Sequence, residues 1–77
     1  MLDLIHIHKQ EDGNIFAQVV IEGRSDDTFH MVFDEAGNVI ASTANKEQRY
    51  YAAQAQIAFQ NHYNVASPQK TISSMWY

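Results

Sequence analysis

The same turn occurs twice in the first half of the chain, and it restricts the fold more than any other feature. Residues 10–14 read Gln-Glu-Asp-Gly-Asn and residues 34–38 read Asp-Glu-Ala-Gly-Asn, with Gly fourth and Asn fifth in each. A β-rich run lies on both sides of each turn. This spacing favours a three-residue hairpin loop in which Gly takes the left-handed conformation at a bulge. Two such loops predict an antiparallel architecture, but they indicate no particular chemistry.

The hydrophobic pattern around the turns predicts a single ββββα domain over residues 1–63, followed by a tail at 64–77. Asn45, with Gln48 three positions later, is typical of a helix N-cap with its capping box, and Thr43 is the alternative cap. We therefore predict an α+β fold in which one long helix packs on one face of a four-stranded antiparallel meander. The tail is expected to form either a fifth strand or a flap. The strands are predicted at about residues 3–9, 15–22, 28–34 and 39–43, and the helix at about 45–62.

Residues directly opposite each other in an antiparallel pair point to the same face, so the turns predict which side chains are buried. We expect Ile5 opposite Val19, Ile21 opposite Phe29 and Met31 opposite Ala41. The predicted core face of the sheet comprises Ile5, Ile7, Ala17, Val19, Ile21, Phe29, Met31, Phe33, Val39 and Ala41. At 100° per residue, the helix stripe expected to lie on this face comprises Tyr51, Ala52, Ala55, Ala58, Phe59, His62 and Tyr63.

The opposite face of the sheet is predicted to be more apolar than a solvated face requires. Three explanations remain open: ordinary surface exposure, cover by the tail, or an interface with another chain. A meander also has free edges that can pair with another strand. The residues predicted to form a protein interface are Leu4, Phe16, Val20, His30, Val32, Ile40 and Trp76.

Histidines and carboxylates provide the candidate ligand sites. His6 and His8 are two positions apart on a predicted strand, so both imidazoles should project from one face and could hold Zn²⁺, Ni²⁺ or Cu²⁺ weakly. His30 is expected on the same face, two strands away. Acidic residues of the two turns gather at one end of the meander, although ordinary turn chemistry explains them. These turn carboxylates are Glu11, Asp12, Asp34 and Glu35.

Composition excludes some classes of function and disfavours others. The chain has no Cys, so disulfides and thiolate metal sites are excluded, and this fits a reducing compartment. The N-terminal residues Met1-Leu2-Asp3-Leu4 lack the basic and long apolar regions of a secretory signal, so we expect a cytoplasmic protein. The formal net charge is −4 and the five Lys and Arg residues are scattered, which disfavours direct binding to nucleic acid or to an anionic membrane. No nucleophile motif or phosphate-binding loop is present, so we expect neither an enzyme nor a cofactor.

Two functional hypotheses follow from these patterns. The first is a small non-catalytic interaction or regulatory module whose protein partner is a second copy of itself, because a chain of 77 residues buries only about 60% of its unfolded surface and gains stability by association. The alternative is a regulator that binds a small ligand or a metal through the strand histidines.

Overall fold

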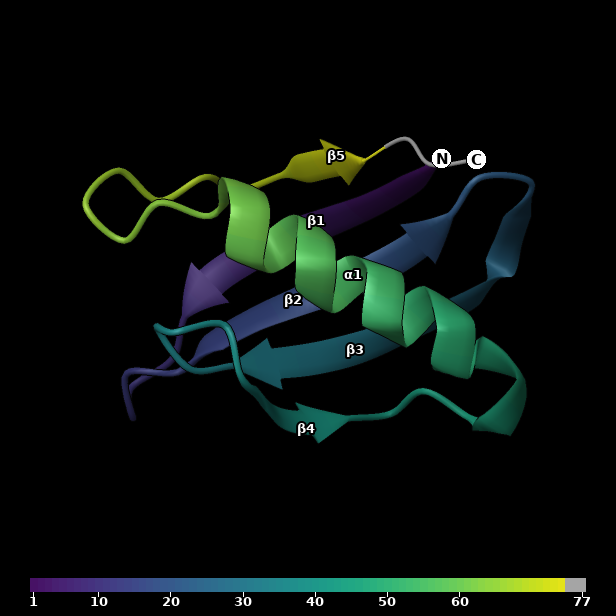
Figure 1. The fold of residues 1–77 in the computed structure, drawn as a ribbon, viewed down its shortest axis with the longest axis horizontal. Helices are drawn as coiled ribbons and strands as arrows, with labels where there is room; N and C mark the ends of the chain where they lie inside the picture. Colours follow the sequence, from purple (N-terminus) through teal and green to yellow (C-terminus); the bar gives the residue numbers. More distant parts are fainter. Residues whose placement is uncertain (75–77) are drawn as a thin grey trace.

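The structure is an antiparallel five-stranded sheet with one helix packed across one face (Figure 1). This computed structural model describes residues 1–74, without the side chain of Ser25. The predicted α+β fold is confirmed, and the tail supplies a fifth strand. The strands are β1 (Leu2–Lys9), β2 (Ile15–Ile21), β3 (Arg24–Phe33), β4 (Val39–Ser42) and β5 (Ile72–Ser74), in the order β4-β3-β2-β1-β5. A 3-10 turn, η1 (Lys46–Gln48), leads into the helix α1 (Arg49–His62).

Both repeated turns form the predicted three-residue loops. In the first turn the backbone N–H of Gln10 donates to the carbonyl of Asn14 at 2.7 Å, and Gly13 N–H donates back to Gln10 at 3.0 Å. The two equivalent bonds of the second turn are 3.0 Å each. Gly13 and Gly37 both have φ of 88°, the left-handed region that glycine enters without strain.

A β-bulge interrupts β1 at a residue that is not glycine. The register against β2 shifts between Ile5 and His8, so that His6 and Ile7 together stand opposite Ala17. His6 has φ of 54° and is the one non-glycine residue with positive φ among those described. A left-handed residue with a side chain costs about 1–2 kcal/mol, so the surrounding structure must hold this conformation in place.

The bulge overturns the predicted faces in the first half of β1. Leu4 pairs with Val19 and is completely buried, whereas the sequence analysis placed it on the opposite face. Ile5 pairs with Gln18 and is half-buried on the side away from the helix, instead of lying in the core. The physical reason is that an extra residue in one strand reverses the face of every side chain beyond it.

The β2–β3 connection is shorter than predicted, but the core face is preserved. Ile21 pairs with Arg24 across a tight turn that contains Gly23, with φ of 81°. Phe29 therefore stands opposite Val19 instead of Ile21. A shift of two residues leaves each side chain on its predicted face, because strand side chains alternate with a period of two.

The edge strand β4 contributes less to the core than expected. Phe33 pairs with Val39 as the turn requires, but Val32 then pairs with Ala41, so that Ile40 is an extra residue. Every residue of β4 is exposed, including Val39 at 39%. The predicted burial of Val39 and Ala41 is therefore wrong, because the extra residue turns Ala41 to the face of Val32 and the edge position leaves Val39 exposed.

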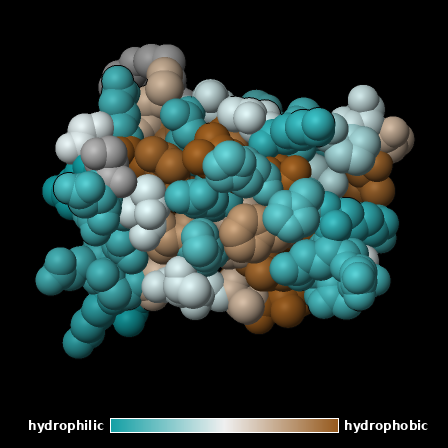
Figure 2. All heavy atoms as spheres, turned by 180° about the vertical axis from the view of Figure 1, so that it is seen from behind, coloured by the Kyte–Doolittle hydropathy of each residue, from teal (hydrophilic) through white to brown (hydrophobic). Residues whose placement is uncertain are grey.

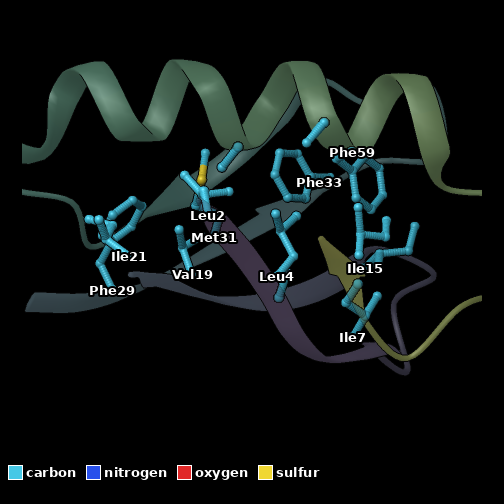
Figure 3. Packing of buried hydrophobic residues seen from close by; sticks show 14 residues of the cluster. Leu2, Leu4, Ile7, Ile15, Val19, Ile21, Phe29, Met31, Phe33 and Phe59 are labelled. Atoms are coloured by element: carbon cyan, nitrogen blue, oxygen red, sulfur yellow. The ribbon is translucent and has the colours of Figure 1, made fainter. Parts of the chain in front are cut away.

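The core lies between the sheet and α1 (Figure 3). Phe59 of the helix stacks on Phe33 of β3 with ring centroids 4.1 Å apart, and on Tyr63 at 4.6 Å. Small Ala55 and Ala58 allow the helix to lie close to the sheet. His62, predicted on the buried stripe, is exposed instead. The buried hydrophobic residues are Leu2, Leu4, Ile7, Ile15, Ala17, Val19, Ile21, Phe29, Met31, Phe33, Ala55, Ala58, Phe59 and Ile72.

The start of the helical segment is fixed by the predicted capping box. The Asn45 side chain accepts from the backbone N–H groups of Glu47 and Gln48, and the Gln48 side chain accepts from Asn45 N–H at 2.9 Å. The buried Gln48 amide also donates to the carbonyl and the carboxylate of Asp27, both at 3.0 Å. This contact joins the beginning of the helical segment to β3.

A second contact holds the C-terminal half of α1 against the second turn. The side-chain amides of Gln56 and Gln60 both donate to the carbonyl of Gly37, at 3.2 and 3.1 Å. A carbonyl oxygen has two lone pairs, so both bonds can be made together. The β3–β4 hairpin and α1 are therefore linked by polar contacts as well as by packing.

Replacing His6 tests the bulge. We expect His6→Val to lower the free energy of unfolding by about 2 kcal/mol, because a β-branched side chain is strained at positive φ. His6→Gly should cause no loss from backbone strain, since glycine adopts this conformation freely. Urea denaturation of both variants measures the difference. Equal losses in the two variants would contradict a left-handed backbone at this position.

Gly13→Ala and Gly37→Ala form a matched pair for the contact between hairpin and helix. Both should lose about 1–2 kcal/mol, because both residues have a positive φ. A Cβ at Gly37 would lie 2.5 Å from Cγ of Gln60, whereas the nearest atom to a Cβ at Gly13 is Cε of Lys9 at 4.0 Å. Gly37→Ala should therefore lose about 1 kcal/mol more, as Gln60 is displaced from its hydrogen bond.

Thermal denaturation compares these two glycine variants, and a second substitution provides the control. Gln60→Ala should cost less stability in the Gly37→Ala background than in the wild-type chain, because the hydrogen bond of Gln60 to the Gly37 carbonyl is already lost there. Identical stabilities of Gly13→Ala and Gly37→Ala would show that the second turn does not touch the helix in solution.

Candidate functional site on the open face of the sheet

The candidate site lies on the face of the sheet away from α1, which we call the open face. No helix within residues 1–74 lies on this side (Figure 1). Apolar side chains lie among hydrophilic ones across the back of the molecule (Figure 2). The strand registers and burial place Ile5, His8, Phe16, Gln18, Val20, His30, Val32 and Ala41 on the open face.

Three rings form a row across the middle of the open face. The ring of Phe16 on β2 lies 5.0 Å from that of His8 on β1 and 5.1 Å from that of His30 on β3, measured between centroids. His8 is the cross-strand partner of Phe16, whereas His30 pairs with Gln18 and reaches the ring diagonally. Phe16 is half-buried because both imidazoles flank it.

The imidazole of His8 is oriented by the bulge next to it. Its Nδ1 lies 2.8 Å from the carbonyl oxygen of His6. A carbonyl can only accept, so Nδ1 carries a proton and donates, which leaves Nε2 as the nitrogen available for other partners. The left-handed residue therefore also fixes the tautomer of its neighbour.

The structure does not bring the three strand histidines together. The ring of Phe16 contacts both His8 and His30, and so it occupies the space between them. His6 lies in the bulge, where the regular alternation that predicted a shared face with His8 is broken. Within residues 1–74, no group of three or more His, Asp or Glu side chains is arranged to hold a metal ion.

Three of the four acidic residues of the turns, Asp12, Asp34 and Glu35, contact neighbouring residues in or beside the turns. The Asp12 carboxylate accepts from the backbone and side chain of Asn14 at 2.9 and 3.4 Å. Glu35 pairs with Lys9 at 3.3 Å, and both side chains are more than half exposed, so this ion pair adds little stability. These contacts support the reading of the carboxylates as turn residues.

The predicted interface residues have different positions in the structure. Phe16, Val20 and Val32 are half-buried on the open face and His30 is exposed there. Ile40 is 54% exposed on the edge strand β4. Leu4 is in the core for the reason given above, and Trp76 lies outside the described residues.

A groove of about 520 Å³ lies beside the bulge and was not found by sequence reasoning. The backbone N–H of Ile7 donates to the carbonyl of Lys70 at 3.1 Å, which brings the residues before β5 alongside β1. The sequence gives no register for so short a final strand, and therefore no indication that Lys70 approaches the histidines. The groove is lined by Ile5, His6, Ile7, His8, Lys70 and Thr71.

Comparisons with protein-family models, with curated proteins and with solved structures find no match for this chain. None of the helices within residues 1–74 has the length and apolar character needed to cross a bilayer. The arrangement of side chains on the open face and in the groove therefore carries the functional argument.

Asp34 provides a test of the second turn. Hydrogen bonds from Asn38, first from its side-chain amide and then from its backbone N–H, hold the pKa of Asp34 below the ordinary value of 3.8. Because the folded-state pKa is lowered, this carboxylate stabilises the fold above pH 3.8, and the contribution is lost as pH falls through the lower folded pKa. An NMR titration of the Asp34 carboxyl carbon should show a midpoint below 3.8.

Two asparagine variants make the titration specific. Asn38→Ala should raise the pKa of Asp34 towards its ordinary value, because the side-chain hydrogen bond is removed. Asn14→Ala, at the equivalent position of the first turn, should leave the Asp34 titration unchanged. An unchanged midpoint in Asn38→Ala would contradict this assignment of the cause.

Proposed function

We propose that this protein is a small non-catalytic interaction module that associates with a second copy of itself through the open face of its sheet. The observation that carries the proposal is the row of His8, Phe16 and His30, with Val20 and Val32 beside it, on a face that no helix of residues 1–74 covers. Contiguous apolar surface on a small protein is typical of an interface.

The charge distribution supports a second copy as the partner. The chain has a formal net charge of −4, so two copies repel each other through most surfaces. Asp3 shares the open face as the cross-strand partner of Val20, whereas the other open-face residues defined above include no Asp, Glu, Lys or Arg. Two open faces can therefore approach each other at a smaller electrostatic cost than other parts of the surface.

The position of Phe16 on the open face supports contact with a similar surface. Phe16 lies centrally between two flanking rings, and aromatic residues in such positions often contribute most of the binding energy of an interface. Phe16, Val20, His30 and Val32 form the proposed contact surface, and Ile40 on the neighbouring edge strand extends it. Association would also increase the buried apolar area of a chain whose single core is small.

The absence of a catalytic role is part of this proposal. The two imidazoles of the open face are separated by a phenyl ring, and one nitrogen of His8 is already engaged with the backbone. A general base needs its substrate proton within hydrogen-bond reach and a partner group that orients it. The scattered basic residues likewise favour a protein partner over nucleic acid or a membrane.

Charged substitutions on the open face test the proposal. We expect the wild-type chain to have a solution mass near twice 8.8 kDa at high concentration, and Val20→Lys or Val32→Lys to weaken association by about tenfold or more. Each change places a charge in an apolar contact. Light scattering behind a sizing column, run over a dilution series, measures the mass.

Ala53→Lys is the matched control, because this residue is exposed on α1 and the change adds the same charge to the other side of the molecule. It should leave the mass unchanged, and circular dichroism should confirm that all three variants are folded. A monomeric wild-type chain at every concentration would refute the proposal. Dimers that persist in both Val variants would show that the open face is not the interface.

A further inference from the structure

The groove beside the β1 bulge brings basic side chains of an acidic protein together. His6, His8 and Lys70 all line it, and no Asp or Glu is among the described residues that do so. Lys9 and Arg24 differ in this respect, because each pairs with a carboxylate, at 3.3 and 3.4 Å. Lys70 forms no ion pair within residues 1–74 and is exposed to solvent.

The backbone fixes the base of the Lys70 side chain at the groove. Its carbonyl accepts the hydrogen bond from Ile7 N–H, at the bulge, and the chain then enters β5. The main chain of Lys70 is therefore held next to β1, and its side chain is exposed to solvent. No carboxylate within residues 1–74 pairs with Lys70, so an anion bound in the groove would be its first charged partner.

The floor of the groove is apolar. Ile5 is half-buried there because the bulge turns it away from the core, whereas the Ile7 side chain is only 4% exposed and offers almost no surface to the groove. Small-molecule sites typically combine an apolar lining with a few polar groups, and their volumes begin at about 300 Å³. The groove, at about 520 Å³, is large enough for a short hydrocarbon chain with one polar end.

The groove is also the site of the backbone strain in β1. His6, with φ of 54°, forms part of its lining, and its carbonyl orients the imidazole of His8. Strained residues of this kind occur preferentially at functional sites. The extra residue that produces the strain is also what turns Ile5 into the groove.

We propose that this groove binds a small amphiphilic carboxylate, with its hydrocarbon part on Ile5 and its carboxylate at Lys70. An ammonium–carboxylate contact provides the head-group recognition, and the apolar floor selects against purely polar anions. Ile5 and His8 belong both to the groove and to the open face, so self-association would cover part of this site, and binding is measured at a protein concentration at which light scattering shows a monomer.

Octanoate is a suitable probe. In a series of two-dimensional NMR spectra, millimolar octanoate should cause saturable shifts of the backbone amides of residues 5–8, 70 and 71. Octylammonium, which has the same chain length and the opposite charge, should cause no saturable shift there. Acetate, which has the same head group without the chain, should bind much more weakly because it covers no apolar surface.

Two lysine substitutions provide a matched comparison. Lys70→Gln should weaken octanoate binding by about fivefold or more, because the charged head-group contact is lost. Lys46→Gln removes the same charge from the exposed start of the helical segment and should leave the affinity unchanged. The amide spectrum of each variant without ligand shows whether it remains folded.

Each other outcome overturns the proposal. No saturable shift with octanoate would mean that the groove does not bind this class of ligand. Equal weakening by Lys70→Gln and Lys46→Gln would show a non-specific charge effect. Equal binding of octanoate and octylammonium would show an apolar surface without head-group recognition. Because binding is measured on the monomer, failure of this site and failure of the proposed dimer are distinguishable.

Discussion

The left-handed backbone at His6 is the constraint on which the rest of the structure depends. Without the extra residue at the bulge, strand alternation would place Leu2 and Leu4 on the opposite face from Ile7. With it, all three side chains are buried under the helix. A small sheet with a single helix can cover only one face, so the bulge gathers the apolar residues of β1 on that face. It also turns Ile5 outward and orients His8, and so it shapes both the groove and the open face.

The helix is held over the sheet by contacts along its length. Gln48 joins its start to Asp27, Phe59 stacks on Phe33 further along, and Gln56 and Gln60 reach the carbonyl of Gly37. These contacts determine which face is covered and therefore which face remains for a partner. The apolar character of the open face is thus a consequence of how the core is built, and the proposed dimer uses the surface that the helix leaves.

Much of this fold could be predicted because its signals are local. The two Gly-Asn turns, the capping box at Asn45 and the alternation along β2 and β3 each depend on a few adjacent residues. The first half of β1 could not be predicted by strict alternation. A signal was nevertheless present in the spacing of the apolar residues. Leu2 and Leu4 follow one alternation and Ile5 and Ile7 follow the other, so the phase changes between Leu4 and Ile5. The groove was missed since it needs the register of β5, which three residues cannot specify.

The pairing of β5 with β1 has a consequence for the lifetime of the groove. The two strands are separated by most of the chain, and closing so long a loop costs entropy that only three residue pairs offset. We therefore expect β5, a three-residue edge strand, to open more readily than the central strands β2 and β3. Lys70 and Thr71 directly precede it and form one wall of the groove, so this wall separates from β1 when the strand opens. A ligand in the groove binds only those molecules in which β5 is paired with β1. Its measured affinity is therefore reduced by the fraction of molecules in which the C-terminal strand is open.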